Sequence, residues 1–290
     1  MSRIAYVNGR YVPQRHACVN VEDRGYQFGD GIYEVVHIHA GRFIDADRHL
    51  GRLERSVAEI RLPMPMPRAA LELVLRELAR RNRVTEGLAY MQVTRGVARR
   101  EHAFPATPVP PAFVATVRRI PPYPASLDGW SLTAITQPDL RWARRDIKSV
   151  NLLPNVLARQ AAKEAGAGEA ILYDPATREV SEGAATTIWI VDAAGTLRTH
   201  PLGHAILPGC TRGALLAELA VAGIAAEERG YTLDELGQAR EVFLTSATSF
   251  VKPILRVDGR VVGDGTPGPV TRRLFDLFAR HVTGGLRNAA

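Results

Sequence analysis

The chain has 290 residues, 46% hydrophobic and 23% charged, which is typical of a folded globular protein and too apolar for a disordered one. Its net charge of +7 suggests a polyanionic partner, but acids are interleaved with the arginines and no dense basic run carries aromatic residues, so nucleic-acid binding is not expected. No apolar run approaches the roughly 18 residues that cross a bilayer, and no signal-peptide core is seen, which predicts a cytoplasmic protein without membrane association.

The first half of the chain is predicted to combine strands with two helices. Leu50, Leu53, Val57 and Ile60 recur every three or four positions, the period of a helix with one buried face. In chain order we expect β-rich structure at 4–45, helices at 45–62 and 68–82, and strands at 89–97 and 112–120 around a polar loop at 98–111. These elements form an N-terminal α/β domain over residues 1–120.

A proline-rich segment without periodicity begins at residue 121, and we expect an interdomain linker at 121–134. A C-terminal α/β domain over 135–290 should follow. Its predicted elements are strands at 131–136, 169–174, 186–192 and 241–246, a hairpin at 254–265, and helices at 155–165, 211–222 and from about 267. The predicted fold class is therefore α+β with two domains.

Lys148 is unusual because lysine occurs at only two other positions, Lys163 and Lys252, while arginine supplies nearly all other positive charge. A lysine amine can lose its proton and attack a carbonyl, whereas a guanidinium cannot. Taken alone, Lys148 is most simply a solvated side chain. A catalytic role requires a neutral amine, which the neighbouring cations Arg144 and Arg145 would favour.

Other polar signals are also weak individually. Glu182 precedes an apolar strand, either as an exposed turn acid or as a partner for a ring nitrogen. The "LPGCT" turn places the amides of Cys210 and Thr211 at a helix start, where a phosphate could bind. Ser246 belongs to a hydroxyl cluster after a strand, and Arg52 lies on an amphipathic helix where most arginines face solvent.

Arg100 and His102 stand two positions apart in the polar loop, so both point the same way in an extended chain. Such a pair can grip a carboxylate, although a solvated basic loop is the simpler interpretation. Cys18 and Cys210 are widely separated and lack metal-ligand neighbours, which predicts neither a disulfide framework nor a metal site. No Rossmann fingerprint or P-loop is present.

Taken together, these residues describe a pyridoxal-phosphate enzyme acting on amino acids. The chain resembles the fold-type IV, branched-chain aminotransferase-like family, and within it the D-amino-acid transaminases. The resemblance runs nearly end to end and is carried by "EDRGYQFGDGIYE" at 22–34, by "DIKS" at 146–149 with the Glu182–Gly183 pair, and by the hairpin "RVDGRVVGDG" at 256–265.

The resemblance implies a function and a role for each candidate residue. We expect D-amino acids to be transaminated with a 2-oxo acid acceptor, with Lys148 forming the Schiff base to pyridoxal 5'-phosphate and moving the α-proton. Glu182 matches the ring-nitrogen partner, Arg52, Cys210, Thr211 and Ser246 match phosphate ligands, and Tyr33, Arg100 and His102 match the trap for the substrate α-carboxylate. The family pattern implies a homodimer in which the arginine and histidine of the trap serve the neighbouring subunit.

Alternatives within the family remain open. They are an L-branched-chain aminotransferase, an (R)-amine transaminase and an aminodeoxychorismate lyase; an inactive relative is disfavoured because Lys148 and Glu182 are intact. The chain also departs from close D-transaminases. It has Ala184, Ala185 and Thr186 where a serine-rich run is expected, and Ala247 where a hydroxyl residue is expected. These departures concern the polar edge of the pocket and not Lys148 or Glu182.

Overall fold

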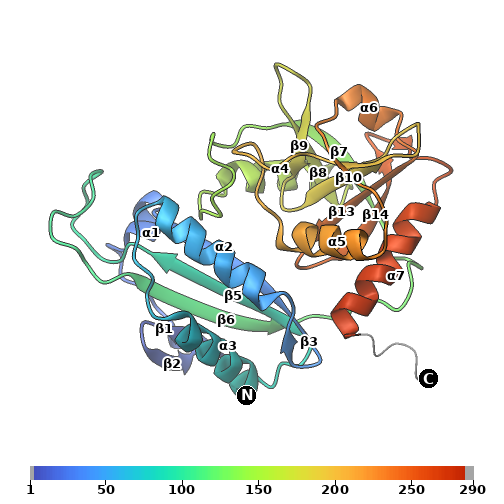
Figure 1. Ribbon diagram of the computed structural model, residues 1–290. Helices are drawn as coiled ribbons and strands as arrows, with labels where there is room; N and C mark the ends of the chain where they lie inside the picture. Colours follow the sequence, from blue (N-terminus) through green and yellow to red (C-terminus); the bar gives the residue numbers. More distant parts are fainter. Residues whose placement is uncertain (1–2, 285–290) are drawn as a thin grey trace. The chain divides into compact units, whose positions relative to one another are not determined.

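The computed structural model describes residues 3–284, and its contacts divide the chain into two units (Figure 1). The first unit comprises Met1–Pro122 and Ile147–Asn151, and the second comprises Tyr123–Asp146 and Leu152–Ala290. Each unit combines one sheet with helices. Among residues 3–284, no helix is both long enough and apolar enough to cross a membrane.

The first unit is built on a six-stranded antiparallel sheet of order β2-β1-β6-β5-β3-β4. Its strands are β1 (Ile4–Val7), β2 (Arg10–Pro13), β3 (Gly31–His39), β4 (Arg42–Phe43), β5 (Gly87–Thr94) and β6 (Ala112–Arg119). Its helices are the 3₁₀ turn η1 (Gln14–His16), α1 (Arg24–Phe28), α2 (Ala46–Glu59) and α3 (Arg68–Asn82). In Figure 1, α2 and α3 lie along the strands of this sheet.

The helical period predicted for α2 is found in its buried face. Leu50, Leu53 and Val57 are at most 1% exposed and share one core cluster with Ile32 and Val36 of β3. Burying aliphatic side chains of this size contributes about 1.5–3 kcal/mol each. The same pair of elements, β3 and α2, carries two candidate site residues, Tyr33 and Arg52, and packing therefore fixes the position of both.

The second unit contains a nine-stranded mixed sheet whose path runs β12-β11-β10-β13-β14-β7-β8-β9, with β15 paired to β14. The strands are β7 (Leu132–Pro138), β8 (Glu169–Tyr173), β9 (Val180–Gly183), β10 (Thr187–Val191), β11 (Leu197–Thr199), β12 (Glu227–Glu228), β13 (Glu241–Ser246), β14 (Phe250–Val257) and β15 (Arg260–Val261). The helices are α4 (Leu153–Glu164), α5 (Cys210–Val221), α6 (Leu233–Gly237) and α7 (Pro269–Thr283).

The short segment that carries Lys148 makes its backbone contacts with the first unit. The Tyr33 amide donates to the Lys148 carbonyl at 3.0 Å, and the Val150 amide donates to the Gly31 carbonyl at 3.0 Å. Ser149 also forms a β-bridge with Ile32. Residues 147–151 therefore extend the first unit, although they follow the proline-rich segment in the sequence.

One local expectation is corrected by the structure, and one is confirmed. Residues 24–28 lie in a region expected to be β-rich, but they form α1, because the Asp23 side chain accepts from the Gly25 amide and caps the helix start. Gly29 ends this helix in the left-handed region, at φ 69°, which favours glycine. The strand predicted at 131–136 is present as β7, which begins at Leu132 and pairs with both β8 and β14.

Candidate active site

Lys148 is held at both its backbone and its amine. Its amide donates to Ser56 Oγ of α2 at 3.4 Å, and its Nζ lies 4.1 Å from the ring centroid of Tyr33. The Tyr33 ring in turn stacks on Tyr90, with centroids 5.9 Å apart. The candidate nucleophile and one residue of the predicted carboxylate trap are therefore in direct contact. Arg144 and Arg145, considered as cations for Lys148, instead bind Asp146 and Asp139.

Arg52 does not face solvent, because β3 supplies a buried carboxylate against it. Arg52 Nε and Nη2 donate to the two oxygens of Glu34 at 2.7 and 2.9 Å, and Glu34 is fully buried. His49, one turn earlier on α2, lies 2.9 Å from the same carboxylate. Burial raises the pKa of Glu34, but Arg52 and His49 outweigh burial and hold it below its ordinary value. Glu34 therefore fixes the orientation of the Arg52 guanidinium.

Replacing Glu34 with glutamine should lower the free energy of unfolding by about 3–5 kcal/mol at pH 7, because it leaves the buried Arg52 charge without its anionic partner. Because the pKa of Glu34 is lower in the folded chain than in the unfolded chain, where it is about 4.3, the charged carboxylate stabilises the folded chain above that pH. This stabilisation is lost as the pH falls from about 4.3 towards the pKa of Glu34 in the folded chain. The gap between wild type and Glu34→Gln should therefore narrow from pH 7 to pH 3.5 in urea unfolding of the cofactor-free protein. An equal gap at both pH values would contradict the assignment.

Glu182 lies on β9, in the second unit, and is 4% exposed. Its Oε1 accepts from Arg141 Nη1, and the Leu207 amide lies 3.3 Å from each of its oxygens. Burial raises the pKa of Glu182 more than Arg141 and the Leu207 amide lower it. The simpler interpretation, an exposed turn acid, is therefore wrong. A buried carboxylate of this kind can hold a protonated ring nitrogen.

Arg141 ties Glu182 to a second buried acid, Asp139. Arg141 Nε and Nη2 donate to Asp139 at 2.9 and 2.7 Å, and Ser181 Oγ donates to Asp139 at 2.6 Å. Burial lowers the pKa of Arg141, but Glu182 and Asp139 outweigh burial and raise it. Arg141 therefore remains charged between the two carboxylates. Arg141 is not among the residues selected from the sequence, because its only distinguishing feature there is its position two residues after Asp139.

The start of α5 and the turn after β13, both expected to bind phosphate, lie close together within the second unit. Cys210 and Thr211 begin α5 and are 6% and 3% exposed. A Cβ on the preceding Gly209 would lie only 2.8 Å from Thr187 Oγ1, so a glycine is needed where the α5 start meets β10. Thr187 pairs with Thr245, the residue before Ser246. The Ser246 hydroxyl accepts from the Ser249 amide at 3.1 Å, within a tight turn.

Arg100 and His102 lie in the loop at 98–111, in the first unit, and both contact Phe28 of α1. The Arg100 Cζ lies 5.1 Å from the Phe28 ring centroid, and the ring centroids of His102 and Phe28 are 5.4 Å apart. The structure therefore groups the two basic side chains of the predicted trap on one aromatic ring. Within the described part of this chain, neither Arg100 nor His102 contacts Tyr33, the third member of the predicted trap.

The residues present suit pyridoxal 5'-phosphate. Lys148 offers an amine for the cofactor aldehyde, and buried Glu182 offers an acceptor for the ring nitrogen. The start of α5 has no side-chain cap, so its first amides are available to a phosphate. Lys148 and Arg52 belong to the first unit, and Glu182 and the amides at the start of α5 belong to the second.

A family model described as "Amino-transferase class IV" matches residues 31–257. A D-alanine aminotransferase of Bacillus licheniformis is 41% identical over 269 residues, covering 92% of this chain and 93% of the relative. A D-alanine aminotransferase of Staphylococcus haemolyticus is 39% identical, with 96% of this chain and 97% of the relative covered.

A solved structure shares the fold. The branched-chain aminotransferase from the thermophilic archaeon Thermoproteus uzoniensis, solved with norvaline, superposes with a TM-score of 0.85 at 25% identity. The superposition covers 99% of this chain and 97% of the other. The predicted α+β, fold-type IV class is thereby confirmed.

Proposed function

Because the chain belongs to the class IV aminotransferase family, we propose that it transfers the amino group of D-amino acids, such as D-alanine or D-glutamate, to 2-oxoglutarate or pyruvate. The observation that carries this proposal is the similarity to D-alanine aminotransferases along nearly the whole chain. The family resemblance carried by the block at 22–34 is confirmed, and so are the aminotransferase class and its cofactor, pyridoxal 5'-phosphate.

We assign the cofactor contacts residue by residue. Lys148 Nζ is the amine that would hold the cofactor, and Glu182 would accept a hydrogen bond from the proton-bearing ring nitrogen. Arg52, oriented by Glu34, and the hydroxyl and amides of Thr211, Cys210 and Ser246 receive the phosphate. The buried position of Glu182 supports its role, because a carboxylate in a water-poor site interacts strongly with a protonated nitrogen.

The same residues divide the work of the reaction. When bound, the cofactor supplies an electron sink for the negative charge that develops at the substrate α-carbon. With the cofactor and substrate bound, Lys148 Nζ would take the substrate α-proton as a general base and return it as a general acid. Tyr33, in contact with Lys148, limits where that amine can move. Glu182 keeps the ring nitrogen protonated throughout.

Substrate handedness follows from the carboxylate trap. Tyr33, Arg100 and His102 bind the α-carboxylate, and a fixed carboxylate leaves only one enantiomer with its α-hydrogen towards Lys148. The protein acts as a cytoplasmic homodimer in which Arg100 and His102 serve the neighbouring subunit. The position of both side chains against Phe28 and not against Tyr33 supports this division between subunits.

Incubating the purified enzyme with D-alanine and 2-oxoglutarate should yield pyruvate and glutamate. Single half-reactions with D-alanine, L-alanine, L-leucine and a chiral amine, followed by the colour change of the cofactor, test specificity directly. We expect D-alanine to react at least about a hundredfold faster than its enantiomer, since discrimination of this size needs only about 2.7 kcal/mol. Conversion of L-leucine without conversion of D-alanine would overturn the proposed substrate class.

A further inference from the structure

Arg24 is a buried arginine for which the cofactor and substrate assignments leave no role. It is 3% exposed, and each nitrogen of its guanidinium donates a hydrogen bond. Nε donates to Asp30 at 2.9 Å, while Nη1 and Nη2 donate to the backbone carbonyls of Glu101 and His102. These two carbonyls lie inside the loop that carries Arg100 and His102. Arg24 therefore holds the loop backbone at Glu101 and His102, directly after Arg100.

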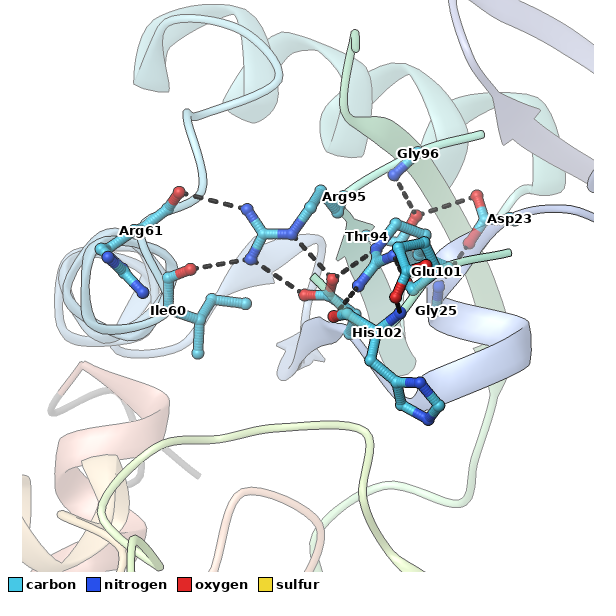
Figure 2. Close-up of polar contacts among 11 residues, drawn as sticks. Asp23, Gly25, Ile60, Arg61, Thr94, Arg95, Gly96, Glu101 and His102 are labelled. Carbon is cyan, nitrogen blue, oxygen red and sulfur yellow. Dashed lines mark hydrogen bonds and ion pairs between the residues drawn. The ribbon is translucent and has the colours of Figure 1, made fainter. Parts of the chain in front are cut away.

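Asp30, the partner of Arg24, is itself anchored to the core of the first unit. Arg95 donates to the two Asp30 oxygens at 2.7 and 3.0 Å. The same guanidinium donates to the Ile60 carbonyl at 2.8 Å and the Arg61 carbonyl at 3.2 Å, where α2 ends. Figure 2 shows Arg95 with Ile60 and Arg61 on one side and Thr94, Glu101 and His102 on the other. A continuous chain of hydrogen bonds thus links α2 to the loop.

Phe28 supports the side chains of the same loop from α1. Its ring contacts Arg100 and His102, and Arg24 Cζ lies 4.8 Å from its centroid. Arginine over an aromatic ring gains about 0.5–2 kcal/mol, depending on burial. In Figure 2 the His102 imidazole points away from the hydrogen-bonded cluster.

We propose that Arg24 and Phe28 are positioning residues that fix Arg100 and His102 for the substrate α-carboxylate. This inference rests on the proposed function, since it assumes that the pair binds a carboxylate. The loop at 98–111 contains no helix or named strand. A loop of this length needs contacts from other elements to keep two side chains in fixed positions. Arg24 fixes its backbone and Phe28 fixes its side chains, so the entropy of ordering the trap is lost on folding and not on substrate binding.

The test compares Arg24→Lys and Phe28→Leu with Phe28→Tyr, which keeps the ring, and with Arg68→Lys, an arginine of the same unit that pairs with Asp47 away from the loop. KM for both D-alanine and 2-oxoglutarate should rise about tenfold in the first two variants, with kcat changed less than about threefold, because binding of the shared carboxylate is weakened. Cofactor absorbance should stay near wild type, as should all constants of Phe28→Tyr and Arg68→Lys.

Arg100→Ala distinguishes a failure of the carboxylate trap from a failure of the positioning role of Arg24 and Phe28. If Arg100→Ala raises KM for both substrates but Arg24→Lys and Phe28→Leu do not, the positioning role is wrong and the carboxylate trap stands. If Arg100→Ala leaves KM unchanged, the trap itself is wrong. Equal losses in Phe28→Leu and Phe28→Tyr, or a fall in kcat and cofactor content without a change in KM, would show a purely structural role and overturn the inference.

Discussion

Replacing Lys148 with arginine should leave a folded protein that has lost transamination by at least about 10⁴-fold. Arginine keeps the positive charge and length of the side chain, but its guanidinium is neither a nucleophile nor a base near neutral pH. Lys148 Nζ must do both jobs. Steady-state assays with D-alanine and 2-oxoglutarate measure the loss, and borohydride reduction followed by peptide mapping measures whether the cofactor is fixed at position 148.

The matched control is Lys252→Arg, because Lys252 is the other lysine whose amine lies against an aromatic ring, at 3.9 Å from the Trp130 centroid. This variant should keep wild-type turnover and wild-type labelling by borohydride. Ordinary transaminase rates in Lys148→Arg would refute the assignment of the nucleophile. Loss of activity in both variants would point to a general sensitivity to substitution and not to a role of Lys148.

Glu182→Gln should lower kcat by about 10²–10³-fold while the protein remains as stable as wild type. The activity falls because a neutral amide no longer keeps the ring nitrogen protonated, and a positioned acid–base group contributes effects of this size. The stability persists because Arg141 retains its two bonds to Asp139, and because burial already disfavours the charged form of Glu182. Turnover and urea unfolding, measured on the same preparations, test both halves of the expectation.

Glu182→Asp provides the comparison, since it keeps a carboxylate but withdraws it by one methylene. It should recover part of the lost kcat. Glu179→Gln, at the residue immediately before β9, should leave turnover unchanged and alter the free energy of unfolding by less than about 1 kcal/mol, because its carboxylate pairs with His200 in a partly exposed ion pair. A fall in stability of Glu182→Gln that matches its fall in activity would mean that the carboxylate serves folding. In that case the ring-nitrogen assignment loses its support.

Sequence patterns predict the elements with a strong period and miss those set by single side chains. The repeat of Leu50, Leu53 and Val57 locates α2 to within a few residues, because burial of one helical face dominates its energetics. The α1 turn escapes prediction, since its formation depends on one cap at Asp23 and one glycine at position 29. The four-residue β9 also escapes it, although it carries Glu182.

The candidate site divides in the same way. Residue type and family pattern select Lys148 and Glu182, but they do not select Glu34, which binds Arg52, or Arg141, which binds Glu182. Nothing in the sequence distinguishes an arginine that binds a buried acid from one that faces solvent, because the distinction depends on which strand lies opposite. Arg52 illustrates this point: most arginines on an amphipathic helix face solvent, but Arg52 lies on the buried face of α2, where β3 places Glu34 against it.

The path of the chain around Lys148 restricts how this protein can be divided. Residues 147–151 hydrogen-bond to β3, while the residues on both sides of them belong to the other unit. A single cut in the gene near residue 122 would therefore assign the nucleophile to the fragment that lacks Tyr33 and Ser56. A recombinant that joins the residues before position 122 of one relative to the residues after it of another therefore takes Lys148 from one parent and the residues that contact it, Tyr33 and Ser56, from the other.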